Sequence, residues 1–128
     1  MSKEHTDLVN KIIHEGNKIP GVRLWPNKTS FAYVGKGARI NTRKGFCIVI
    51  KNGHGLRFGL QEGSSDIIGY YKCGENCIPR FVAIEVKTGE DKRKPEQIQF
   101  GKVMEEDNCL YGVARCVEDL YTILWGEK

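Results

Sequence analysis

Asp66, Glu85 and Lys87 are the side chains whose types and spacing could do chemistry together. Asp66 opens an apolar run over residues 66–71, and Glu85 and Lys87 close a second run over residues 81–87. Residues two apart on a strand share a face, so Glu85 and Lys87 should point the same way. A hairpin between the two runs would then bring Asp66 within a few ångströms of Glu85. Paired carboxylates suit a hard divalent cation such as Mg²⁺, and the lysine suits a phosphate or an activated water.

The surrounding segments predict an α/β fold that could hold these residues in place. Apolar residues at helical spacing predict three helices, at residues 4–15, 95–108 and 117–125. Short apolar runs predict two further strands, at residues 22–25 and 109–114. The inward side chains of the helices are expected to be Leu8, Val9, Ile12, Ile13, Ile98, Phe100, Val103, Met104, Leu120, Ile123 and Leu124. This order of elements predicts a single domain over residues 1–128, with helices packed on a mixed sheet.

The segment from Asn27 to Gly55 is rich in glycine and basic residues. Its apolar runs, Phe31–Val34 and Phe46–Ile50, could form strands or a protruding ribbon, and Asn52-Gly53 is a turn signal. The simplest interpretation is a solvated surface. If the segment faced the reactive residues, it would instead contact phosphates and bind less tightly as salt is added.

Composition and charge narrow the class of protein. The chain has a net charge of +4 and a pI near 8.8, which is compatible with a polyanionic partner. No apolar run approaches the roughly 20 residues that cross a bilayer, and the start lacks a signal peptide's apolar middle. We therefore expect a cytoplasmic protein that does not insert into a membrane. Its five cysteines are expected to be free thiols, with half a zinc site at Cys73 and Cys77 as the less favoured alternative.

The chain resembles the PD-(D/E)XK nucleases in the order of these features. It has an acid at the start of one strand, Glu-x-Lys on the next strand and then a helix. The longer context is similar to the VRR-NUC domain, the virus-type replication-repair branch of that superfamily, often a compact stand-alone phage protein. The segments that carry this resemblance are 63–69, 83–89, 95–97 with Phe100, and 112–120. Many relatives have proline before the first acid, where this chain has Ser65.

The resemblance implies a restriction-endonuclease-like core and a metal site. Asp66 and Glu85 would hold Mg²⁺ or Mn²⁺ with help from the main-chain carbonyl of Val86. Lys87 would orient or deprotonate the attacking water, or stabilise the transition state. Gln97 matches the family's glutamine and would line the same pocket.

The superfamily often adds an acid from its first helix. Glu4 is the first candidate for this metal ligand, judged by its distance from Trp25, and Glu15 is the alternative.

The function implied is metal-dependent hydrolysis of DNA phosphodiester bonds. The expected substrate is structured or branched DNA such as a Holliday junction, cut by a homodimer in the cytoplasm of a bacterial host if the protein is encoded by a phage. One alternative is a catalytically silent nucleic-acid-binding module with the same fold, suggested by the basic segment. Another is a nuclease that serves restriction or tRNA processing.

Overall fold

The computed structural model describes residues 2–126, and the chain divides into two compact units. One unit combines the chain up to Asn27 with the chain from Gln61 onward, and we call it the core unit. The other, Lys28–Leu60, is the ribbon unit.

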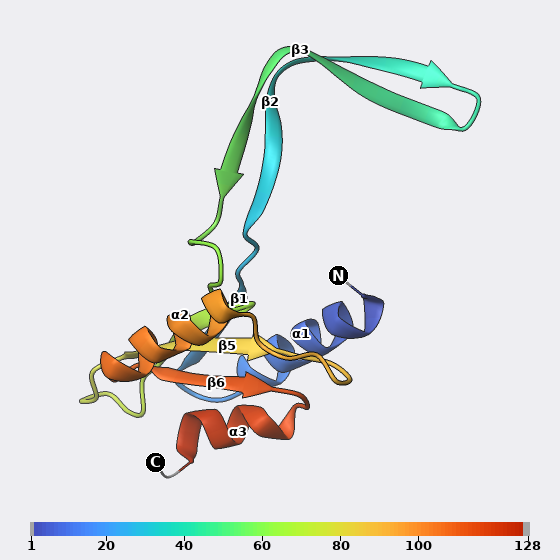
Figure 1. Ribbon diagram of the computed structural model, residues 1–128. Coiled ribbons are helices and arrows are strands. Elements are labelled where there is room, and N and C mark those ends of the chain that lie inside the picture. Colours follow the sequence, from blue (N-terminus) through green and yellow to red (C-terminus); the bar gives the residue numbers. More distant parts are fainter. Residues whose placement is uncertain (1, 127–128) are drawn as a thin grey trace. The chain divides into compact units, whose positions relative to one another are not determined.

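The core unit is built on a mixed sheet with strand order β1-β4-β5-β6. Its strands are β1 (Val22–Pro26), β4 (Ile67–Tyr71), β5 (Arg80–Val86) and β6 (Leu110–Ala114). β4 pairs antiparallel with both β1 and β5, so the predicted hairpin is confirmed. β6 runs parallel to β5, and α2 (Pro95–Glu106) makes the crossover between them (Figure 1).

Alternation along β5 divides the core into two clusters. Val82, Ile84 and Val86 are fully buried against α1 (Lys3–Gly16) and α3 (Glu118–Trp125). Ala83 points to the other face of the sheet and packs under α2. The helices therefore flank the sheet on both sides, which confirms the mixed α/β class.

The predicted inward stripes of α1 and α3 are confirmed. Val9 and Ile12 of α1 are buried, and Leu8 and Ile13 pack partly against them. The three predicted apolar residues of α3 are also buried, namely Leu120, Ile123 and Leu124.

The stripe predicted for α2 is wrong in two of its four positions. Ile98 and Val103 are exposed, at 44% and 38%. Phe100 is buried beside Gly101, where an added Cβ would meet the Tyr111 ring at 2.5 Å. The helix therefore approaches β6 closely at a glycine, and its apolar side chains do not all lie on the inward face.

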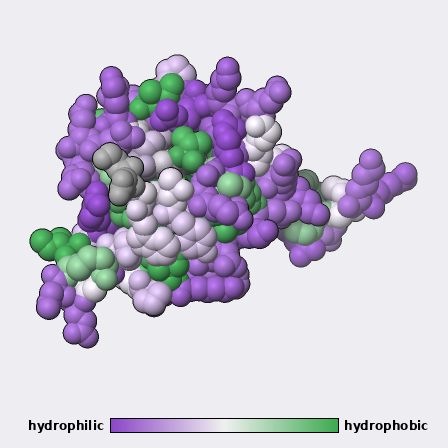
Figure 2. Space-filling model, turned by 90° about the horizontal axis from the view of Figure 1, so that it is seen from below, coloured by the Kyte–Doolittle hydropathy of each residue, from purple (hydrophilic) through white to green (hydrophobic). Residues whose placement is uncertain are grey.

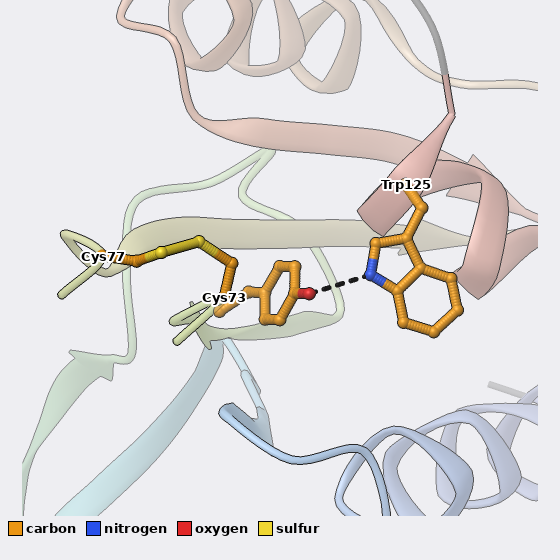
Figure 3. Close-up of a disulfide and its surroundings, with 4 residues drawn as sticks. Cys73, Cys77 and Trp125 are labelled. Carbon is orange, nitrogen blue, oxygen red and sulfur yellow. Dashed lines mark hydrogen bonds between the residues drawn. A yellow bond between two sulfur atoms is a disulfide. The ribbon is translucent and has the colours of Figure 1, made fainter. Parts of the chain in front are cut away.

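A disulfide joins Cys73 and Cys77 in the loop between β4 and β5 (Figure 3). The prediction of free thiols is therefore wrong for this pair, and the bond also removes both sulfurs from the alternative zinc site. The other three cysteines are free, as predicted. Near this loop Trp125 Nε1 donates to the Tyr71 hydroxyl at 2.9 Å, which ties α3 to β4 (Figure 3).

The ribbon unit consists of two long antiparallel strands, β2 (Ser30–Thr42) and β3 (Gly45–Phe58), which bend together along their length (Figure 1). The turn lies between Thr42 and Gly45, and Asn52-Gly53 lies within β3. The prediction of a turn at Asn52-Gly53 is therefore wrong. Asn52 does have the positive φ of 51° that such a signal indicates, but it sits opposite the register shift between Val34 and Lys36.

No helix within residues 2–126 is long and apolar enough to span a membrane. The face shown in Figure 2 is largely hydrophilic, with hydrophobic residues in separate patches.

Candidate functional site

Strand register places Asp66 opposite Glu85. Ile67 pairs with Ile84 in the β4–β5 ladder, so the next position outward on each strand aligns the two acids. Asp66 Oδ2 accepts a hydrogen bond of 2.9 Å from the Val86 N–H. The carboxylate is thereby fixed at the end of β5, beside Glu85.

Glu85 is buried, at 2% exposed, and only one of its two oxygens has a hydrogen-bond partner. Its Oε1 accepts from Gln97 Nε2 at 3.1 Å and lies 3.9 Å from Lys87 Nζ. Its Oε2 is buried with no hydrogen-bond partner. Burial, and then the neighbouring Asp66 carboxylate, raise the pKa of Glu85 to about 9, against the smaller lowering effects of Lys87 and Arg93.

Gln97 reaches Glu85 because it heads the inward stripe of α2. It precedes Phe100, Gly101 and Met104 at spacings of three, four and seven, which is one face of a helix. Its Oε1 accepts from the Lys94 N–H at 2.8 Å and so caps the helix, while its Nε2 bonds to Glu85. The helix cap and the site therefore share one side chain.

Asn27 holds the turn that precedes Asp66. Its side-chain amide donates to Ser64 Oγ at 2.9 Å and to the Ser65 carbonyl at 2.8 Å. Its main-chain N–H donates to the Asp66 carbonyl at 2.7 Å. These three bonds join Asn27 to the turn that leads into Asp66.

His5 is the site residue that sequence reasoning missed. Its Nε2 lies 3.0 Å from the Val86 carbonyl and 3.5 Å from Asp66 Oδ2. Because a carbonyl only accepts, Nε2 carries the proton, and Nδ1 is buried without a partner. A signal was present, since His5 precedes the buried Val9 and Ile12 by four and seven residues on one helical face.

The structure does not bring Glu4 to this cluster. Glu4 and Glu15 instead line a separate cleft of about 490 Å³ beside the start of α3. Glu15 also pairs with Lys18 at 3.0 Å. Neighbouring positions on a helix point about 100° apart, so placing His5 against the sheet turns Glu4 away from it.

The site opens into a cleft of about 470 Å³. Its walls include the two acids, Asp66 and Glu85, and the residues around them, His5, Lys87 and Gln97. Two basic residues of the loop before α2, Lys92 and Lys94, also line it. The cleft therefore combines the paired carboxylates of Asp66 and Glu85 with basic side chains, and Asp91 is a third acid in its lining.

The donor set fits one divalent cation of the Mg²⁺ type. Within residues 2–126, no three His, Cys, Asp or Glu side chains are grouped so that they alone could hold a metal ion. Mg²⁺ needs fewer, because it is commonly bound by one or two carboxylates and keeps several waters. Asp66 and the unpartnered Oε2 of Glu85 supply those two carboxylates, whereas the Val86 carbonyl is bonded to His5.

No protein-family model matches the chain, and a search of curated proteins found no match.

Proposed function

We propose that the protein is a metal-dependent endonuclease that hydrolyses DNA phosphodiester bonds, with a PD-(D/E)XK core of the VRR-NUC type. The observation that carries this proposal is the convergence of Asp66, Glu85, Lys87 and Gln97 on one cleft. An ion pair on a sheet surface would leave Glu85 exposed, whereas this glutamate is buried with one oxygen unpartnered.

Each residue has a part in the hydrolysis. Asp66 and Glu85 hold Mg²⁺ or Mn²⁺, which when bound lowers the pKa of its water and neutralises charge on the phosphate. Lys87, only 12% exposed at its side chain, orients the attacking water or stabilises the phosphoryl oxygens. Gln97 keeps Glu85 in place through its 3.1 Å hydrogen bond.

The proposed substrate is structured DNA such as a four-way junction, cut by a homodimer. The choice of substrate follows the sequence resemblance. A homodimer is proposed because each chain supplies one such catalytic site, and two sites would be needed to cut two strands together. Basic residues on the wall of the cleft, Lys92 and Lys94, suit a phosphate backbone at the site.

The test is cleavage of supercoiled and four-way-junction DNA by purified protein with Mg²⁺, Mn²⁺ or a chelator. We expect metal-dependent nicking, and a fall of at least about 100-fold in Lys87→Ala, as for loss of a group that handles a proton. Asp66→Ala should be equally impaired, while Glu105→Gln, at an exposed position of α2, should match the parent. No nicking with either metal, or an Asp66→Ala protein as active as the parent, would overturn the proposal.

The alternative is a catalytically silent nucleic-acid-binding module with the same fold. It is favoured by the hydrogen bond between His5 and the Val86 carbonyl, which occupies an oxygen expected to face the metal. Salt-dependent DNA binding that Glu85→Ala leaves unchanged, without cleavage under any condition, would support this alternative.

A further inference from the structure

The positive charge of the chain is concentrated in the ribbon unit. Residues 28–60 contain seven Lys and Arg and no Asp or Glu. Taking these seven from the 20 Lys and Arg of the chain leaves 13 against 16 Asp and Glu, a net charge of −3. The core unit is thus mildly acidic as a whole, and the net positive charge that would attract a polyanion over a distance lies in the ribbon unit.

The basic side chains of the ribbon unit are exposed, and two of them lie directly opposite each other in an arrangement that a counter-charge would favour. Lys36 and Lys51 are direct cross-strand partners, and like charges in that position destabilise a sheet. No acid exists within the ribbon sequence to separate them. A phosphate between the two lysines would remove the repulsion.

Arg39 is already positioned for contact. Its guanidinium lies 4.1 Å from the centre of the Phe46 ring on the same face of the ribbon unit. Stacking on a ring limits the rotamers of the arginine and leaves its N–H groups free to point outward. Arg43 and Lys44 form the turn itself, so the basic residues continue to the tip.

Both faces of the ribbon unit mix charge with apolar surface. Directly paired residues share a face, which assigns Lys36, Lys51, Ile40 and Val49 to one side and Arg39, Phe46 and Ile48 to the other. Phe46 and Ile48 are 56% and 61% exposed. An element that lies on a membrane needs one apolar and one charged face, which this ribbon lacks. A second ribbon would meet it with the same positive charge.

We propose that the ribbon unit, Lys28–Leu60, is a nucleic-acid-binding element that contacts the phosphates of a duplex through Lys36, Arg39, Arg43, Lys44 and Lys51. A two-stranded ribbon has the width of the DNA major groove. The exposed apolar side chains then lie against bases and sugars. This binding depends on the ribbon residues alone and does not require the core unit to cleave.

The test measures binding of the full chain to a short fluorescein-labelled DNA duplex by fluorescence anisotropy, with a chelator present to prevent cleavage. Arg39→Gln with Arg43→Gln and Lys44→Gln should weaken binding at least about tenfold and reduce the slope of log K against log salt by about 0.9 per lost contact. A core variant with the same loss of charge, Lys11→Gln with Lys18→Gln and Lys102→Gln, should bind like the parent.

A second variant separates binding from folding. Lys36→Gln with Lys51→Gln removes the cross-strand repulsion, so it should leave the ribbon unit at least as stable while weakening DNA binding. Equal losses in the ribbon and core variants would mean that net charge alone attracts DNA, and would overturn the assignment. Ribbon variants that bind DNA like the parent would also overturn the assignment. The same holds if the ribbon residues were needed for sedimentation with vesicles of phosphatidylserine and phosphatidylcholine but not for DNA binding.

Failure of the ribbon assignment can be distinguished from failure of the proposed endonuclease activity. If Asp66→Ala retained salt-dependent binding and the parent failed to nick DNA, the ribbon assignment would stand and the nuclease proposal would fail. If ribbon variants bound like the parent while metal-dependent nicking remained, the reverse would hold.

Discussion

Burial of Glu85 makes the stability of the metal-free protein depend on pH. In the folded chain the pKa of this carboxyl is raised from 4.5 to about 9, so the folded state keeps a proton that the unfolded state releases. The contribution of Glu85 to the free energy of unfolding should therefore be full below about pH 4.5, fall as pH rises and be lost above about 9. The slope due to Glu85 is at most about 1.4 kcal/mol per pH unit, the limit for one proton.

Chemical denaturation of the parent and Glu85→Gln in chelator, across pH 5 to 9, would measure this effect. Glutamine has nearly the shape of the protonated acid and no charge, so the difference between the two proteins should grow with pH. A difference that stays constant across the range would show that Glu85 is ionised in the folded chain.

His5 should act as a positioning residue for the proposed cation site. Its Nε2 bonds to the Val86 carbonyl and lies near Asp66, so its loss would release two groups at the base of the cleft. We expect His5→Ala to lower cleavage about 10- to 100-fold and to raise the Mg²⁺ concentration for half-maximal rate. His5→Gln, which can still donate to the carbonyl, should recover part of the loss.

His14→Ala is the matched control, because His14 is exposed on the same helix. If His5→Ala lowered the rate at every Mg²⁺ concentration by the same factor as it lowered the folded fraction, the role would be structural only.

The residues on β5 could be predicted from the sequence because a strand repeats every two residues. That period placed Glu85 and Lys87 on one face and aligned Asp66 with them. His5 could not be found by looking for acids, since its position depends on how α1 is rotated against the sheet. The buried stripe at Val9 and Ile12 defines that rotation.

Asn27 is expected to set the position of Asp66 through the turn before β4. Asn27→Ala would leave the Ser65 carbonyl without its side-chain donor, so we expect a loss of about 1–2 kcal/mol in unfolding free energy. Cleavage should also fall, because the main chain at Asp66 would gain freedom. Thermal denaturation and a nicking assay would measure both effects.

Asn10→Ala provides the comparison, at an exposed position of α1 where no such bond exists to be lost. Should Asn27→Ala match it in stability and rate, the turn would be held by other contacts.

Helices and strands were predictable where one periodic signal dominated. All elements of the core unit lie where the apolar pattern placed them, within a few residues at their ends. In α2 the pattern failed because the helix contacts β6 through Gly101, which carries no apolar signal. In the ribbon unit, Asn52-Gly53 gave a turn signal because a residue opposite a register shift needs the same positive φ.

The strands of the ribbon unit were among the predictions from the sequence, but its separation from the core unit as a second compact unit was not, because neither boundary carries a linker composition. The ribbon unit contains no buried residue, so its strands are held mainly by their own ladder. A disulfide over a sequence separation of 4 likewise has no periodic signal, since either cysteine could be free in a loop of this kind. The two-unit division and the disulfide both depend on which parts of the folded chain lie close together. The spacing of residues in the sequence does not determine this.

Removing the ribbon unit should therefore leave a folded core unit. Asn27 and Ser64 are joined by a 2.9 Å hydrogen bond, so a short Gly-Ser linker can replace residues 28–60. All residues of both buried clusters are retained in the core unit. Because an isolated two-stranded ribbon is marginally stable, its removal should shift the melting temperature by only a few degrees, about 5 °C at most.

The shortened protein also separates the two proposed roles within one molecule. Its net charge would be −3, so it should bind duplex DNA weakly at any salt concentration and nick it only at low salt with Mg²⁺ or Mn²⁺. Circular dichroism would confirm that the core unit is folded before either comparison is made. A folded, shortened protein that binds DNA as tightly as the parent would place the binding surface on the core unit, whose excess of acids would then require a cation at the cleft to attract phosphate.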